Sequence, residues 1–176
     1  MDNAPTINQT PEQRARDEID KRLIAAGWVV QAKNAINFSA GPGVAVREYQ
    51  TDVGPADYAL FVDRQAVGII EAKPESWGQN ITTVELQSAG YAAAKLKWVN
   101  NTEPLPFVYE STGVITRFTD YRDPAPRSRE VFNFHRPETL AELVQQHDTL
   151  RSRLRAMPPL NSDGLRACQI TAITNL

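Results

Sequence analysis

The sequence predicts an α/β fold in which a mixed β-sheet is flanked by helices. The amino-terminal segment has an amphipathic helical pattern, short apolar runs with alternating polarity follow it, and a second helical pattern over residues 82–98 interrupts those runs. The chain has 176 residues, of which 41% are hydrophobic. That length and composition support one compact domain with a core and some flanking material.

Composition and charge exclude several classes of protein. The formal net charge is -2, so the chain has no overall basic field for holding polyanions. Cys168 is the single cysteine of the sequence, which excludes an internal disulfide framework and predicts a reducing compartment, the cytoplasm. The sequence has no apolar run long enough to span a membrane, so we expect no membrane partner.

The first helix is predicted from its end signals. Residues 1–9 are polar and unpatterned and are predicted to be a disordered leader. Thr10 can cap the helix, Pro11 suits its first position, Gln13 completes a capping box and Gly27 is placed to end it. The apolar stripe of this helix consists of Ala15, Ile19, Leu23 and Ala26.

Strands are predicted on both sides of the second helical pattern. The first hairpin joins strands 57–62 and 66–73 across the loop Asp63-Arg64-Gln65. The remaining strands are predicted at WVVQ, at VREYQ, and in a second hairpin, PFVYEST with VITRF, that turns at Ser111-Thr112-Gly113. DYRDPAPRSRE is predicted as a linker or long surface loop, and a helix is predicted from the following RPETLAEL up to Met157.

The first hairpin carries a group of charged residues. Residues two apart share a strand face, so Glu71 and Lys73 point the same way. If the hairpin is centred on Arg64, Asp57 lies directly opposite Glu71, whereas a slip of one residue puts Tyr58 there instead. The sequence thus permits one geometry in which the three charges converge.

Two carboxylates in this geometry need a cation between them. At about 4 Å they repel by roughly 4 kcal/mol at the dielectric near a protein surface. Oxygen ligands suit Mg²⁺, and a neighbouring lysine can orient water or stabilise charge on phosphate, as in a metal-dependent phosphodiesterase. The alternative is that these residues are solvated charges at strand ends.

Several motifs resemble those of a known nuclease superfamily. Pro55-Ala56-Asp57 followed by Glu71-Ala72-Lys73 resembles the PD-(D/E)xK motif, here with one residue inserted between Pro and Asp. The segment from Gln87 to Tyr91 resembles the QxxxY motif of nucleases fused to helicases. REYQTDVGPADYALFVDRQAVGIIEAK and FNFHRPETLAEL resemble the R subunit (HsdR) of type I restriction-modification enzymes. GLRACQITAITNL resembles the segment before the ATP-binding loop of superfamily 2 helicases, with Gln169 as its glutamine.

The resemblance implies a restriction-endonuclease-like core and a set of site residues. In such a site Asp57, Glu71 and the Ala72 carbonyl hold Mg²⁺, and Lys73 acts on the water or the transition state. Gln87 and Tyr91 position DNA or brace the site. A helix glutamate often completes these sites, for which we expect Glu12, with Glu18 as the alternative.

The resemblance also implies a domain organisation and partners. Residues 10–135 would be the endonuclease domain, and residues 136–176 a helical linker and the start of a truncated superfamily 2 helicase motor. We expect hydrolysis of duplex DNA in a complex with methyltransferase (M) and specificity (S) subunits. ATP is expected only for a full-length subunit, because these 176 residues contain no GxxxxGK[ST] loop.

Two alternatives remain open at this point. One is a free-standing PD-(D/E)xK nuclease, such as a junction resolvase or a type IV-like enzyme. The other is a degenerate nuclease fold that only docks a motor onto methyltransferase subunits.

Overall fold

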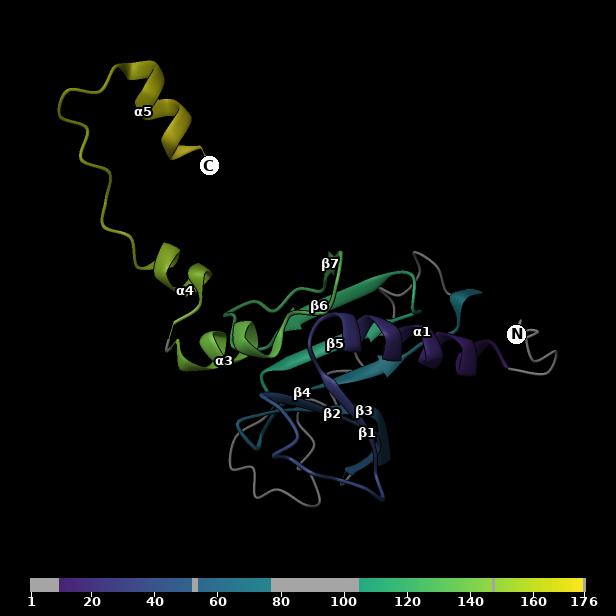
Figure 1. The fold of residues 1–176 in the computed structure, drawn as a ribbon. Helices are drawn as coiled ribbons and strands as arrows, with labels where there is room; N and C mark the ends of the chain where they lie inside the picture. Colours follow the sequence, from purple (N-terminus) through teal and green to yellow (C-terminus); the bar gives the residue numbers. More distant parts are fainter. Residues whose placement is uncertain (1–9, 52–53, 77–104, 147, 176) are drawn as a thin grey trace.

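A mixed β-sheet with helices packed against it forms the body of the molecule (Figure 1). The computed structural model describes residues 10–51, 54–76, 105–146 and 148–175. Within these residues the strands are β1 (Val29–Ala32), β2 (Gly43–Thr51), β3 (Gly54–Val62), β4 (Gln65–Ala72), β5 (Phe107–Ser111), β6 (Thr116–Asp120) and β7 (Arg129–Val131). The helices are α1 (Pro11–Ala25), α3 (Pro137–Gln145), α4 (Leu150–Arg155) and α5 (Ala167–Thr174).

The described strands follow one another across the sheet in the order of the chain. The pairs β1/β2 and β4/β5 are parallel, and the other neighbouring pairs are antiparallel. This is the mixed sheet with flanking helices that the sequence predicts. The parallel β4/β5 pair places the open end of the first hairpin beside the turn of the second hairpin, in the middle of the sheet.

Helix α1 begins and ends at the predicted signals. The Thr10 side chain accepts a hydrogen bond from the Gln13 backbone N–H at 3.2 Å, and Pro11 is the first helical residue. The predicted capping box is wrong in its second half, because the Gln13 side chain donates to Asp17 at 3.2 Å and no bond to the Thr10 backbone N–H is formed. Gly27 has φ 93°, a conformation that favours glycine just after a helix.

The first hairpin has the predicted register at its open end, for a different reason than expected. Tyr58 pairs with Ile70, as a hairpin centred on Arg64 requires. The turn, however, is the two-residue Asp63-Arg64, with φ 47° and 67°, as a type I′ turn needs. The predicted three-residue loop is therefore wrong. A bulge between Leu60 and Phe61 shifts the register by one residue, and this shift restores the pairing that a hairpin centred on Arg64 would have.

Two apolar clusters cover the two faces of the sheet. Helices α1 and α3 pack on one face, where Ile19, Leu23 and Leu140 contact strand residues such as Leu60 and Ile70 (Figure 1). On the other face the cluster consists of Val44, Val46, Tyr49, Ala56, Ala59, Phe61, Ile69, Leu105 and Val108. Glu71 is two residues after Ile69 in β4, so the two side chains share a face and Glu71 extends from the second face.

The carboxyl-terminal part differs from the prediction in two places. The end of the expected surface loop forms β7, which pairs with β6. The expected continuous helix is divided into α3 and α4, with Gln146 as the extended residue that ends α3. Leu140 of α3 lies in the core, whereas α4 and α5 have no buried residues and extend away from the sheet (Figure 1).

No helix among the described residues is long and apolar enough to cross a membrane.

Candidate active site

The open end of the first hairpin brings the predicted acidic residues together. The register at Tyr58 and Ile70 leads directly to Asp57 and Glu71 at the next position. Asp57 Oδ2 accepts a hydrogen bond of 2.9 Å from the backbone N–H of Ala72, which fixes the Asp57 side chain against β4. Asp57 of β3 is therefore held beside Glu71 of β4 at the open end of the hairpin.

Lys73 lies beside Glu71. Its Nζ is 4.0 Å from Glu71 Oε2, and 15% of its side chain is exposed. Its backbone N–H donates to the Ser111 carbonyl at 2.8 Å, which extends the β4/β5 pairing past the end of β4. The backbone of Lys73 is therefore fixed by the sheet, and its ammonium group lies next to Glu71.

Glu71 is a buried carboxylate in an unfavourable environment. It is 7% exposed, and its Oε1 is buried with no hydrogen-bond partner among the described residues. Burial, together with the charges of Asp57 and Glu110, raises the pKa of Glu71 from 4.5 to about 7, and the charges of Lys73 and Arg16 oppose this rise. The folded chain therefore disfavours the ionised form of this side chain.

Glu110 is an acidic neighbour that the sequence analysis missed. It is 3% exposed on β5 and is the register partner of Glu71. Its signal in the sequence is a single acidic residue inside the apolar run FVYES. That signal becomes informative only once β4 and β5 are known to be parallel neighbours, because parallel partners share a face.

Arg16 is the second residue that was missed. Its guanidinium contacts Asp57 Oδ1 at 2.5 Å, and its Nε is buried without a hydrogen-bond partner among the described residues. Tyr58 positions this part of α1, because its hydroxyl lies within hydrogen-bond distance of the Arg16 carbonyl, at 3.1 Å, and of Asp20 Oδ1, at 2.8 Å. A basic residue at this helical position gave no signal in the sequence, since its partner is 41 residues away.

The two helix glutamates proposed to complete the site lie elsewhere on α1, and the QxxxY residues are not described. Glu12 is exposed in the first turn of α1, one turn before Arg16, and Glu18 forms an ion pair with Lys21 at 3.1 Å. Gln87 and Tyr91 lie outside the described residues.

A divalent cation fits the acidic pair. An orphaned, buried carboxylate oxygen beside a second carboxylate is relieved by a hard cation, because the cation offsets both the repulsion and the lost hydration. Asp57, Glu71 and the Ala72 carbonyl offer oxygen ligands of the kind that Mg²⁺ binds. Within the described residues, no group of three or more His, Cys, Asp or Glu side chains is arranged as a metal cluster.

A pocket of about 330 Å³ opens beside Asp57. Its walls come from α1, the β1–β2 connection, β2 and the start of β3, and they consist of Arg16, Lys33, Glu48, Gln50, Pro55, Ala56 and Asp57. Asp57 is therefore accessible from this side to a molecule of moderate size.

Comparisons with known proteins agree on one family. Residues 29–144, more than half of the chain, match the profile of the family described as the type I restriction enzyme EcoKI endonuclease subunit second domain. The EcoKI endonuclease subunit of Escherichia coli (strain K12) is 26% identical over an alignment of 219 residues, which covers 96% of this chain and 18% of the relative. The chain thus spans less than a fifth of that relative's length.

A solved structure has the same fold. It is a fragment assigned as an HsdR subunit of a type I restriction enzyme from Vibrio vulnificus YJ016, and it matches with a TM-score of 0.52 and 18% sequence identity. The match covers 79% of this chain and 26% of the other. At this identity the likeness supports the α/β restriction-endonuclease-like fold.

Proposed function

The chain belongs to the family of the second domain of type I restriction enzyme endonuclease subunits, and we propose that it is the Mg²⁺-dependent DNA-cleaving domain of such a subunit. Its substrate would be the phosphodiester backbone of duplex DNA. The proposal rests on the family and on the acidic pair with its neighbouring lysine, which has the residue types of a PD-(D/E)xK site.

The observation that carries the proposal is the state of Glu71. A buried carboxylate with a raised pKa and an orphaned oxygen is unfavourable for a purely structural role. Carboxylates with strongly raised pKa values cluster at functional sites, and a bound cation would offset the cost of burying the charge of Glu71. Asp57 and Lys73 on either side of Glu71 are the groups that metal-dependent phosphodiester hydrolysis needs.

Each residue would have a separate role in the reaction. Asp57, Glu71 and the Ala72 carbonyl would hold the cation. When bound, a divalent cation polarises the scissile phosphate and makes water a better nucleophile at neutral pH. Lys73 would orient the attacking water and stabilise the negative charge that grows on the phosphate.

Arg16 has to release Asp57 Oδ1 before that oxygen can bind a cation. The guanidinium lies 2.5 Å from Oδ1, while Ala72 N–H holds Oδ2. In the cation-free chain Arg16 therefore supplies the positive charge that offsets Asp57. Glu71 Oε1 has no hydrogen-bond partner among the described residues, so it can bind a cation without first losing a contact.

The proposal places this chain within a larger enzyme. ATP-driven translocation by motor domains outside these residues would bring DNA to the site, and methyltransferase (M) and specificity (S) subunits would select the DNA.

Residues 136–176 would link the nuclease domain to that motor. In the present structure the Gln169 side chain accepts a hydrogen bond from the Arg166 N–H at 2.9 Å, which caps α5. Gln87 and Tyr91 would brace the site or position DNA.

Cleavage by the intact subunit tests the proposal. Asp57→Ala, Glu71→Ala and Lys73→Ala should each abolish Mg²⁺-dependent cleavage of plasmid DNA while ATP-driven translocation continues, because these residues hold the cation and the water but not the motor. Glu75→Gln, four residues from Glu71 and exposed, is the matched control.

Two outcomes would contradict this function. Normal cleavage by the Asp57 and Glu71 variants would place the reaction elsewhere and favour a docking role for this domain. Loss of translocation together with cleavage in a folded variant would contradict the proposed division of labour. The isolated chain should cleave slowly or not at all, because its net charge of -2 gives weak DNA binding.

A further inference from the structure

Glu48 is a strained residue at the edge of the candidate active site. Its φ is 49°, in the left-handed region that residues with a side chain rarely adopt. Such strain persists where the surroundings impose it, and it is often found at functional sites. The strained residue lies in β2 between Arg47, which forms an ion pair with Asp20 at 2.6 Å, and Tyr49, which is buried.

Two cations hold the Glu48 carboxylate. Lys33 Nζ lies 2.8 Å from Oε2, and Arg16 Nη1 lies 3.7 Å from Oε1. The hydrogen bond and charge of Lys33, followed by the charge of Arg16, lower the pKa of Glu48 despite some loss of hydration. Arg16 and Lys33 thus converge on one anion, and Arg16 also reaches Asp57.

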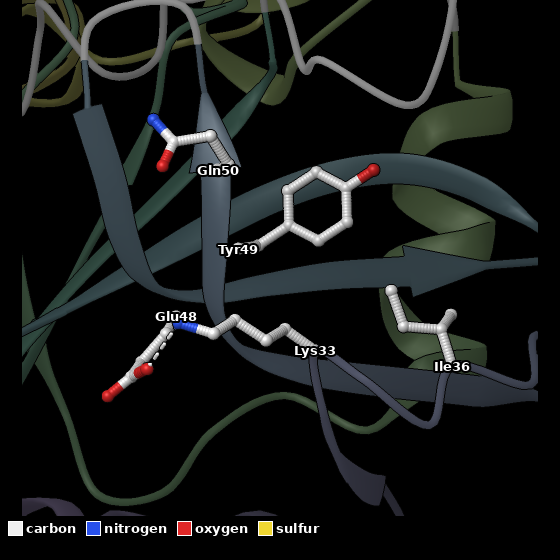
Figure 2. Close-up of a pocket in the computed structure, with 5 residues that line it drawn as sticks. All are labelled: Lys33, Ile36, Glu48, Tyr49 and Gln50. Atoms are coloured by element: carbon white, nitrogen blue, oxygen red, sulfur yellow. Dashed lines mark hydrogen bonds and ion pairs between the residues drawn. The ribbon is translucent and has the colours of Figure 1, made fainter.

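The pocket beside Asp57 adjoins a second pocket of about 280 Å³. The two pockets share Lys33, Glu48 and Gln50. Figure 2 shows Ile36 and Tyr49 together on one side of the second pocket and the Glu48 carboxylate on the other, with Lys33 extended to it. The second pocket therefore has a polar side and an apolar side, and it continues the pocket beside Asp57.

We propose that Arg16 and Lys33 form a binding site for a backbone phosphate of the DNA strand, next to the phosphate that is cut. In the DNA-free chain the Glu48 carboxylate occupies the place of that phosphate. The strand would displace Glu48 as the partner of both cations, and the partly exposed Ile36 would contact the adjoining deoxyribose. This inference rests on the proposed function, because it takes the cleaved strand to pass Asp57.

Charge complementarity supports this occupant. A phosphodiester is a monoanion with two free oxygens, as a carboxylate is, so it can replace Glu48 between two separated cations. Lys33 and Arg16 remain 61% and 33% exposed at their side chains, so both can be reached from solvent. The chain's net negative charge makes a local pair of this kind necessary for strand contact.

Equilibrium binding of a fluorescein-labelled DNA duplex to the 176-residue chain tests the site. The titrations use EDTA and a series of salt concentrations, so neither a metal nor cleavage enters the readout. Lys33→Ala should reduce the steepness of the salt dependence by about one counterion. Glu48→Gln should tighten binding by up to about fivefold, the equivalent of releasing one exposed ion pair.

The ion pair of Lys21 with Glu18 provides matched controls. Its atoms are 3.1 Å apart and its side chains are comparably exposed, at 73% and 45%, and neither residue lines the two pockets. Lys21→Ala and Glu18→Gln make the same charge changes and should leave affinity and salt dependence close to wild type. Equal effects of the two pairs would overturn the site, since they would show only general electrostatics.

Three other results would also overturn the inference. They are an unchanged affinity of Glu48→Gln, no measurable binding by the wild type at the lowest salt, and equal competition by a mononucleotide, which would assign the pocket to a free nucleotide. Failure of the proposed nuclease activity is a separate result, because it is read from cleavage by Asp57→Ala in the intact subunit.

Discussion

Replacement of Glu71 by glutamine should make the stability of the chain less dependent on pH. Glutamine keeps the shape of the side chain but cannot ionise. In the wild type the folded-state pKa of Glu71 is about 7, against an ordinary value of 4.5. The folded state therefore holds the Glu71 proton more tightly than the unfolded state does.

The direction and size of the effect follow from this difference. Below pH 4.5 Glu71 is protonated in both states and imposes no penalty. Between pH 4.5 and about 7 the unfolded state loses its proton first, so wild-type stability falls as the pH rises. Above pH 7 the penalty is complete, at about 3 kcal/mol for the whole pKa difference, since a tenfold change corresponds to about 1.4 kcal/mol.

Urea unfolding of Glu71→Gln and wild type at pH 4 and pH 8 measures this penalty. The new amide changes stability at both pH values by the hydrogen bonds that it gains or lacks, so the informative quantity is the change between them. The variant should gain about 3 kcal/mol relative to wild type on going from pH 4 to pH 8. The exposed Glu75→Gln should gain little. A pH-independent difference between Glu71→Gln and wild type would refute the reasoning.

Two further predictions concern the parts of the fold that support the site. Arg22→Ala should lower the free energy of unfolding by about 2 kcal/mol, because the guanidinium donates to the carbonyls of Gly113, Val114 and Phe132 and so links α1 to the β5–β6 turn and to the end of β7. In urea unfolding the exposed Lys21→Ala should change stability by less than about 0.5 kcal/mol, and equal losses would contradict the role of Arg22. Gly68→Ala should destabilise by about 1–3 kcal/mol, because its Cβ would lie 2.5 Å from the Phe107 carbonyl oxygen in the neighbouring strand. A neutral or stabilising result in thermal unfolding would contradict the close β4/β5 pairing.

Local signals in the sequence were sufficient for the ends of the first helix but not for the turn of the first hairpin. Thr10, Pro11 and Gly27 define the ends of α1 in the sequence and in the structure. The hairpin turn was misjudged because Asp63 and Arg64 adopt positive φ without the glycine or asparagine that usually indicates a type I′ turn. The bulge compensated for this error, so the pairing of Tyr58 with Ile70 agrees with the register expected for a hairpin centred on Arg64, although the predicted loop was wrong.

Contacts between distant segments could not be derived from the same signals. Glu110 lies beside Glu71 only because β5 returns parallel to β4, and sequence patterns do not specify which strands become neighbours. Arg16 reaches Asp57 only because α1 docks on the sheet through Tyr58. The sequence therefore predicted the acidic pair and its lysine, and the structure added the charges that surround them.

Equilibrium binding of Mn²⁺, followed by electron paramagnetic resonance, tests the central claim most directly. Mn²⁺ accepts the same oxygen ligands as Mg²⁺, and the free ion gives a signal that is lost on binding. The chain should bind one Mn²⁺, and Asp57→Asn and Glu71→Gln should each weaken that binding at least about tenfold, as expected for loss of a charged ligand. Glu75→Gln should bind as the wild type does. Equal Mn²⁺ binding by all four proteins, or no binding by the wild type, would contradict a metal site at Asp57 and Glu71.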